Sequence, residues 1–175
     1  AFSAGTEYVA SIFMVLAALP FVRYVQLLNG NNMAVFRDAQ VRGFLMTIAV
    51  LVVICAAVLA IGQDRGFEPA FRQALFNIIS IVSGTGYASS DYMLWGSFLV
   101  ALFFFTGLIG GCAGSTACSI KIFRYQLLFA SIRTQMRRIH SPNGIFTPRY
   151  EGRPVSEDVL SSVMSFFVFF VVTMG

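Results

Sequence analysis

The sequence predicts an all-α polytopic membrane protein, and three observations lead to this fold class. Hydrophobic residues make up 57% of the chain and charged residues 11%, whereas a soluble domain has roughly 45–50% and about 25%. Two segments, 43–62 and 92–120, contain no charged residue. The first would form a helix of about 30 Å, which matches the hydrocarbon core of a bilayer. The third observation is a short helical segment between them, which ends in the glycine-rich stretch "IVSGTGYASSDY", Ile81–Tyr92.

The first helix is expected at Tyr8–Leu28, with Pro20 as a kink. A polar connection, Asn29–Arg42, separates it from a membrane-spanning helix over 43–62. The sequence opens without a methionine and stops inside the apolar run "VMSFFVFFVVTMG". That run is too short to complete a crossing, so we expect this chain to be a piece of a longer protein.

The next helix, 70–82, is expected to enter the membrane and turn back. Pro69 suits its start, and thirteen residues reach only about 20 Å, which is too short to span. If the helix turns back, the loops 23–42 and 121–153 lie on one side and carry ten of the twelve Lys and Arg residues. This asymmetry is the positive-inside pattern of cytoplasmic loops, so the sequence favours a re-entrant pore helix.

The glycine-rich segment Ser83–Tyr87, "SGTGY", follows this short helix. Irregular backbone at membrane depth is tolerated only where protein buries it or where it lines a water-filled cavity. A short helix followed by an extended, glycine-containing return is how carbonyl-lined cation filters are built. The alternative is a solvent-exposed turn outside the membrane. Gln73, Asn77 and Ser80 form one polar face of the helix, which we expect to pack against neighbouring polar groups rather than ions.

A second spanning helix is expected at Tyr92–Ile109, continuing towards His140 after a break at 110–119. Gly110, Gly111 and Gly114 predict this break, because each glycine inside a helix costs about 1 kcal/mol relative to alanine. A loop over 141–154 follows, and the capped start of a last membrane helix is expected at Ser156.

Charged residues near these elements have competing interpretations. Asp91 either attracts cations outside the filter or caps the helix that starts at Tyr92, and the cap is the simpler role. Glu7 is expected to be a cap or a charge at the pore mouth rather than an ion ligand. A cytoplasmic basic patch is expected to fix orientation and meet anionic lipid headgroups; it consists of Lys121, Arg124, Arg133, Arg137 and Arg138.

Other classes of function find little support in the sequence. The only histidine, His140, lies in a basic stretch without a nearby carboxylate or cysteine, so no catalytic triad or metal cluster is expected. Cys55, Cys112 and Cys118 lie in apolar segments and are expected to be small buried hydrophobes. Aromatic residues do not alternate with basic ones, which argues against a nucleic-acid partner. No phosphate-binding loop followed by lysine is present, so no nucleotide site is expected in this chain.

Three longer stretches give the sequence a family resemblance: "SGTGYASSDYMLWGSF", "FFTGLIGGCAGSTACSIKIFR" and "RRIHSPNGIFTPRYEGRPV". Together they resemble the TrkH family, the membrane subunits of bacterial Trk-type potassium uptake systems within the Trk/Ktr/HKT superfamily. The resemblance implies four helix, pore-helix, helix units around one pore. Residues 1–42 would end the second unit, 43–140 would form the third, and 141–175 would be a cytoplasmic loop and the start of the fourth.

The resemblance also implies roles for individual residues. The third filter segment, which binds potassium, would be Ser83, Gly84, Thr85, Gly86 and Tyr87. An intramembrane gating loop beneath the filter would include Gly110, Gly111, Cys112, Ala113, Gly114 and Ser115. The family's loop ends in a run of glycines, whereas this chain has Ala117, Cys118 and Ser119 there.

The function implied is potassium uptake across the bacterial inner membrane, with K⁺ bound in the filter and no organic cofactor. The implied partners are the remaining pore units, a second copy in a homodimer, a cytoplasmic nucleotide-binding regulatory subunit that would meet the basic patch, and the lipid bilayer. The alternative is a membrane-embedded scaffold whose glycine loops only allow helices to pack closely. Channel-like flux and flux coupled to protons or sodium both remain open.

Overall fold

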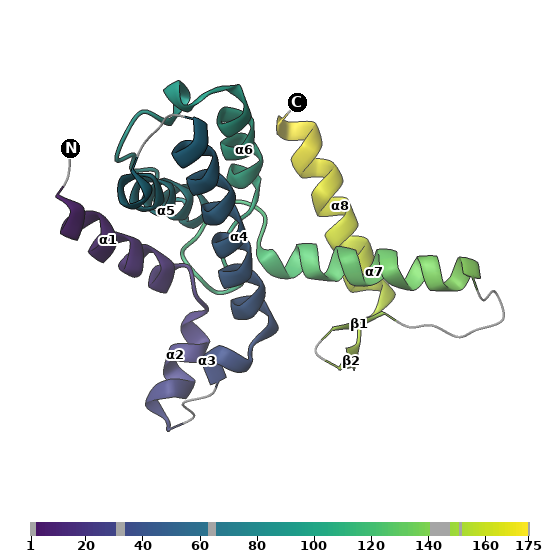
Figure 1. The fold of residues 1–175 in the computed structure, drawn as a ribbon. Helices are drawn as coiled ribbons and strands as arrows, with labels where there is room; N and C mark the ends of the chain where they lie inside the picture. Colours follow the sequence, from purple (N-terminus) through teal and green to yellow (C-terminus); the bar gives the residue numbers. More distant parts are fainter. Residues whose placement is uncertain (1–2, 31–33, 63–65, 141–147, 151, 175) are drawn as a thin grey trace. The chain divides into compact units, whose positions relative to one another are not determined.

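A computed structural model describes the chain apart from residues 1–2, 31–33, 63–65, 141–147, 151 and 175 (Figure 1). The described residues are mostly helical, as the sequence predicts. In chain order the elements are α1 (Ala4–Ala17), α2 (Phe21–Leu28), α3 (Ala34–Arg37), α4 (Ala39–Gly62), α5 (Phe67–Ser83), the 3-10 turn η1 (Tyr92–Trp95), α6 (Ser97–Leu108), α7 (Ile122–His140), β1 (Arg149–Tyr150), β2 (Arg153–Pro154) and α8 (Glu157–Met174).

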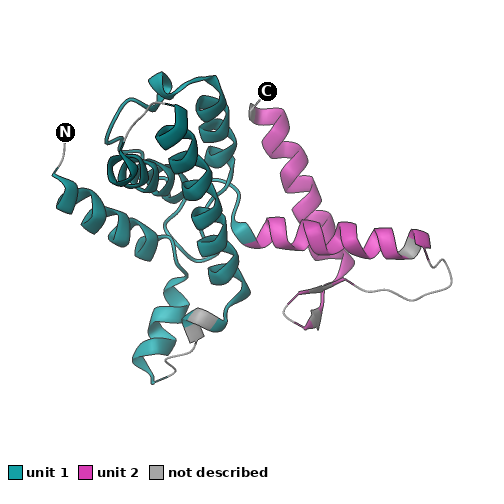
Figure 2. Ribbon diagram, in the orientation of Figure 1, with its two compact units in different colours: residues 1–122 teal, residues 123–175 magenta. Residues whose placement is uncertain are grey.

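The chain divides into two compact units, residues 1–122 and residues 123–175 (Figure 2). Among the described helices, α4 alone is long and apolar enough to cross a membrane by itself, and α1 and α2 meet that criterion only as a bent pair. Helix α4 begins four residues before the expected 43–62 segment and ends where expected. Its high hydropathy is therefore a membrane signal that agrees with the composition of the whole chain.

The first unit is built around the short helix α5, which packs against α4, α1 and α6. Its core includes Phe44 and Leu59 of α4, Ile78 of α5 and Leu99 of α6, all fully buried. Figure 1 shows α4 ending and α6 beginning at the same end of this unit. The helix α5 and the segment that follows it therefore connect two helices of opposite direction.

The first helix departs from the prediction, because Tyr8–Leu28 is not a single kinked helix. It breaks after Ala17, and α2 continues at an angle of 91° to α1. Proline lacks an N–H group and disfavours helical geometry in the residue before it, so Pro20 terminates α1 rather than merely bending it. Residues 18–20 form an elbow whose backbone groups need partners outside the helix.

The helix expected to begin at Tyr92 also starts later. Residues 92–95 form a 3-10 turn, Gly96 adopts a φ of 103°, and α6 runs only from Ser97 to Leu108. A side chain at position 96 would be strained at that angle, so glycine sets the direction in which α6 enters. Twelve residues span about 18 Å, which leaves α6 shorter than a complete crossing.

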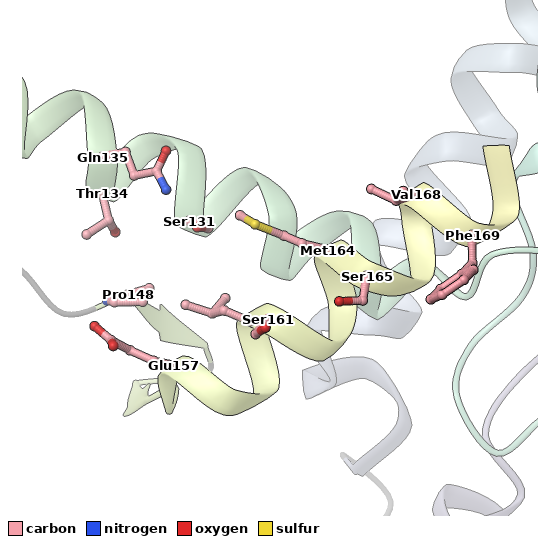
Figure 3. A pocket seen from close by; sticks show the side chains of 11 residues that line it. Ser131, Thr134, Gln135, Pro148, Glu157, Ser161, Met164, Ser165, Val168 and Phe169 are labelled. Atoms are coloured by element: carbon pink, nitrogen blue, oxygen red, sulfur yellow. The ribbon is translucent and has the colours of Figure 1, made fainter. Parts of the chain in front are cut away.

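The second unit contains α7, the two-residue hairpin β1–β2 and α8. Within this unit, a cavity of about 570 Å³ lies between α7 and α8 (Figure 3). Hydroxyl and amide side chains of α7, such as Ser131 and Gln135, line it together with apolar residues of α8, such as Met164 and Phe169. Tyr150 ties the hairpin to α7 by donating to Gln126 Oε1 at 2.8 Å.

Candidate ion-binding site

The candidate filter begins where α5 ends. Gly84 caps the helix with a left-handed φ of 77°, which glycine adopts without steric cost. The N–H groups of Thr85 and Gly86 then both donate to the Ser80 carbonyl, at 3.0 and 3.2 Å. No peptide bond in the described chain is cis, and in a trans peptide the N–H and C=O point in opposite directions. The carbonyls of Gly84 and Thr85 therefore point away from the end of α5.

This arrangement gives the candidate filter two carbonyl oxygens, those of Gly84 and Thr85, that face away from α5. Residues 84–87 are exposed on the surface of the unit, whereas Ser83 is buried. The Ser83 and Thr85 hydroxyls are hydrogen-bonded to each other at 2.8 Å. Gly86 has a φ of 78°, and no atom lies within 4 Å of the position that a Cβ would occupy. Its glycine is therefore required by backbone conformation and not by lack of space.

The chain returns from the filter through residues 84–91, called here the return segment. Asn77 of α5, which is fully buried, holds this segment against the helix. Its Nδ2 donates to the Gln73 carbonyl at 2.8 Å and to the Ser89 hydroxyl at 3.0 Å, and its Oδ1 accepts from the Ser89 N–H at 3.2 Å. The prediction that this residue packs against polar neighbours is confirmed. Sequence reasoning did not identify Ser89, although a buried amide in an apolar helix signals that such a partner must exist.

The glycine loop after α6 closes at a narrow neck. Ile109 and Ile120 pair in parallel, and the Gly110 N–H donates to the Ile120 carbonyl at 2.9 Å. A Cβ on Gly110 would lie 2.0 Å from the carbonyl oxygen of Cys118. A side chain does not fit there. The two chain segments of the neck touch through their backbones, which is a specific reason for glycine at this position.

The loop is attached to the elbow between α1 and α2. Breaking a helix leaves carbonyls and N–H groups without intrahelical partners. Here the backbone groups left by the break between α1 and α2 form hydrogen bonds with those of the loop after α6. The N–H of Cys112 donates to the Ala18 carbonyl at 3.0 Å, that of Phe21 to the Gly114 carbonyl at 3.1 Å, and that of Thr116 to the Ala17 carbonyl at 3.4 Å. The Ala113 N–H donates to Gln40 Oε1 of α4 at 3.0 Å.

The far end of the loop meets the start of the candidate filter. A Cβ placed on Gly84 would lie 3.2 Å from both the backbone nitrogen and the Cβ of Cys118. Cys118 is exposed, so the expectation that it is buried was wrong, whereas Cys55 and Cys112 are buried as expected. Ser119 has a φ of 62°, in the region that favours glycine. Its hydroxyl donates to the Gly107 carbonyl at 2.7 Å, which helps to hold this conformation.

The residues of the expected basic patch have different local surroundings, and Lys121 belongs to the first unit whereas the four arginines belong to the second. The Lys121 ammonium donates to the Ala117 carbonyl within the loop, and Arg124 lies 3.6 Å from the centroid of the Phe166 ring. Arg133 and Arg137 are exposed on α7. Arg138 belongs to α7 by its backbone, and its side chain lies outside the described part of the chain.

The two acidic residues have different outcomes. Asp91 is confirmed as a helix cap, because its carboxylate accepts from the Met93 N–H at 3.0 Å. Glu7 is neither a cap nor a charge at an open mouth: Ser3 caps α1, and Glu7 is buried and paired with Arg72 of α5. This ion pair joins α1 to the candidate pore helix, and its partner lies too far along the sequence to be found by spacing.

A helical chain with a membrane-length apolar helix, a short helix that ends at a left-handed glycine and an adjoining broken helix has the features of a membrane protein. Comparison with known proteins supports that class: the family model of TrkH, described as a cation transport protein, matches residues 6–175. The chain therefore belongs to the TrkH family and is part of a multi-pass membrane protein.

Individual relatives agree with this assignment. The chain is 38% identical over 168 residues to the Trk system potassium uptake protein TrkI of Halomonas elongata, covering 96% of this chain and 34% of that protein. It is 30% identical to the Trk system potassium uptake protein TrkH of Escherichia coli, covering 91% and 33%. The crystal structure of the potassium transporter TrkH from Vibrio parahaemolyticus matches with a TM-score of 0.91 and 25% identity, covering 97% and 37%. The chain thus spans about a third of the length of these relatives.

Proposed function

We propose that this chain supplies one quarter of a potassium-conducting pore in the bacterial inner membrane. Residues 43–140 would form one complete helix, pore-helix, helix unit, preceded by the end of a second unit and followed by the start of a fourth. The relatives are named as potassium uptake proteins, and this chain covers about a third of each. The remaining pore units would come from the rest of the full-length protein.

The observation that carries this proposal is the contact between the two irregular segments. Gly84, at the start of the candidate filter, lies against Cys118, at the end of the glycine loop. Irregular backbone within a membrane needs a polar or protein environment. Here the candidate filter and the glycine loop, both irregular, lie in contact with each other. A scaffold needs small residues for close helix packing, but it does not need a row of carbonyls beside a second broken helix.

Potassium would bind to backbone carbonyls of residues 83–87, among which those of Gly84 and Thr85 point away from the end of α5. These oxygens would replace part of the hydration shell of the ion, and the equivalent segments of three other units would complete its coordination. The C-terminal end of α5 carries the negative end of the helix dipole and lies next to these carbonyls, so it would stabilise a cation there. Asn77, through its hydrogen bonds to Ser89, would keep the return segment in place while ions pass.

The loop from Gly110 to Ser119 would act as a gate beneath the filter. The contact between Cys118 and Gly84 supports a position of this loop beside the inner end of the candidate ion path. Three glycines and several small or hydroxyl residues give it weak helical preference, so alternative conformations lie within reach. We place Gly110, Gly111, Cys112, Ala113, Gly114 and Ser115 in this gate.

The other partners follow from the same assignment. A cytoplasmic nucleotide-binding regulatory subunit would meet the exposed arginines of α7, and the full-length protein would form a homodimer. The cavity between α7 and α8 would be filled by later parts of the fourth unit, because two of the apolar side chains that line it, Val168 and Phe169, are exposed.

The test is potassium flux through the full-length protein in lipid vesicles, with and without a deletion of 115–119. A gate predicts that the deletion raises basal flux per folded molecule while the K⁺/Na⁺ ratio stays the same. A scaffold predicts no ion-dependent flux in the intact protein. Loss of folding without any gain of flux in several overlapping deletions would contradict the gate and leave the filter to be tested separately through Gly86.

A further inference from the structure

The side chain of Lys121 is the unusual basic group of this molecule. It is the only lysine in the sequence, and the other eleven of the twelve Lys and Arg residues are arginines. Its ammonium donates to the Ala117 carbonyl, and it also lies 3.4 Å from the Ser115 carbonyl and 3.5 Å from the Ser115 hydroxyl. Three oxygens of the glycine loop thus converge on one cationic group.

Lysine suits this position better than arginine on chemical grounds. An ammonium is a compact point charge with three rotatable donors, whereas a guanidinium is a planar fork that fits two parallel acceptors. Three oxygens from a tightly turned loop match the ammonium and not the fork. The position is otherwise unfavourable for a cation, because Lys121 directly precedes α7 and the N-terminus of a helix carries partial positive charge.

The two halves of the loop are held in different ways. Residues 112–116 are attached to the elbow by backbone hydrogen bonds to Ala17, Ala18 and Phe21. Residues 117–119 follow this attached part, and the middle one of them, Cys118, contacts Gly84. The bonds from Lys121 to Ala117 and Ser115 join the exit of the loop to the end of its attached half. Together with the backbone, these bonds close a loop that contains residues 117–119, the segment beside the candidate filter.

We propose that Lys121 is a positioning residue that acts as a latch and holds residues 117–119 against the filter. This inference rests on the proposed gate. Releasing the ammonium would remove the side-chain tie across the segment while the backbone bonds of 112–116 to the elbow remain. The segment could then move away from Gly84 without unfolding of the rest of the unit.

A simpler role for Lys121 is to provide one more positive charge on the cytoplasmic side of the membrane. The two roles predict different effects of arginine. An orienting charge tolerates Lys121→Arg, because the charge is unchanged. A latch does not tolerate it, because the fork cannot reach three converging oxygens from the same backbone position.

The experiment uses the full-length protein in lipid vesicles and compares Lys121→Met, Lys121→Arg and the control Arg42→Met, which removes an exposed charge from the start of α4. A second readout is the rate at which a thiol reagent modifies Cys118, with the other reactive cysteines replaced. We expect both Lys121 variants to raise basal potassium flux and Cys118 modification roughly tenfold, which equals about 1.4 kcal/mol in the loop equilibrium. The control should stay within about twofold of the unmodified protein.

Unchanged Cys118 modification in correctly folded Lys121→Met would overturn the latch. Normal behaviour of Lys121→Arg alongside an altered Lys121→Met would also overturn it and favour the orienting charge. If the unmodified protein carries no potassium flux, the proposed function fails. The Cys118 rates would still decide whether Lys121 holds the loop, so the two failures are distinguishable.

Discussion

Replacing Asn77 by alanine tests whether the conformation of the return segment, residues 84–91, depends on one buried amide. The substitution removes the two contacts with Ser89, at 3.0 and 3.2 Å, and leaves the Ser89 N–H without its partner. A typical hydrogen bond contributes about 1 kcal/mol, and an unpaired buried group costs about 1–3 kcal/mol. We therefore expect a loss of roughly 2–4 kcal/mol in unfolding free energy. Ser89→Ala keeps the backbone contact and should cost only about 1 kcal/mol.

The assay combines stability with selectivity in the full-length protein. Thermal unfolding of Asn77→Ala, Ser89→Ala and the double variant forms a cycle, and we expect a coupling of about 1 kcal/mol because the two side chains share a bond. The K⁺/Na⁺ flux ratio should fall in Asn77→Ala, because the filter carbonyls lose their support. Thr106→Val is the matched control: its hydroxyl is equally buried, and it bonds within α6 to the Leu102 carbonyl.

Three results would refute this reasoning. Additive stability effects, with a coupling within about 0.3 kcal/mol of zero, would mean that the Asn77–Ser89 bond contributes nothing specific. An unchanged flux ratio in a destabilised Asn77→Ala protein would mean that the amide supports the fold and not the filter. A fall in the ratio for Thr106→Val would show that selectivity responds to any loss of stability.

Three further predictions concern glycines and the buried ion pair. Gly86→Ser should lower the K⁺/Na⁺ flux ratio, because a φ of 78° costs a side-chain-bearing residue about 1–2 kcal/mol; an unchanged ratio would contradict the filter assignment. Glu7→Gln should lower unfolding free energy by about 3 kcal/mol, the lower end of the range for breaking a buried pair, because Arg72 keeps its contact with Glu68, while Glu68→Gln, which alters an exposed i,i+4 pair, should change it by under about 0.5 kcal/mol. Equal effects in thermal unfolding would argue against the buried pair. Gly110→Ala should disrupt the neck of the loop and alter basal flux, whereas Gly107→Ala, whose Cβ would meet a neighbour at an ordinary 3.8 Å, should not; matching flux in the two variants would exclude a close backbone contact at the neck.

Several elements were predictable because their signals are local. The apolar, uncharged segment of α4 and the short helix α5 follow from hydropathy and length. Helix α5 begins three residues before and ends one residue after the expected 70–82, so Ser83, expected as the first filter residue, is the last residue of the helix; Gly84 then adopts the left-handed conformation typical of helix ends. The cap at Asp91 is also a local signal, since the carboxylate contacts an N–H two residues away.

The features that were missed depend on partners far away in the sequence. Pro20 is visible as a helix breaker, but the 91° bend needs acceptors and donors from a loop almost a hundred residues later. Glu7 pairs with Arg72 across 65 positions. Lys121 looked like one charge among several, because nothing in the local pattern indicates that its ammonium turns back into the loop.

The mutual satisfaction of the elbow and the loop limits how a gate here could move. Moving residues 112–116 would leave the Ala17 and Ala18 carbonyls and the Phe21 N–H without partners, and each unpaired backbone group in a membrane costs several kcal/mol. Moving residues 117–119 breaks fewer bonds to other elements: the Ser119 hydroxyl bond to Gly107 and the Lys121 contacts. The segment that contacts the filter is therefore also the segment whose displacement costs the least free energy. A deletion confined to 117–119 should consequently raise flux at a smaller cost in stability than one that reaches into 112–116, and the reverse order in thermal unfolding would contradict this division of the loop.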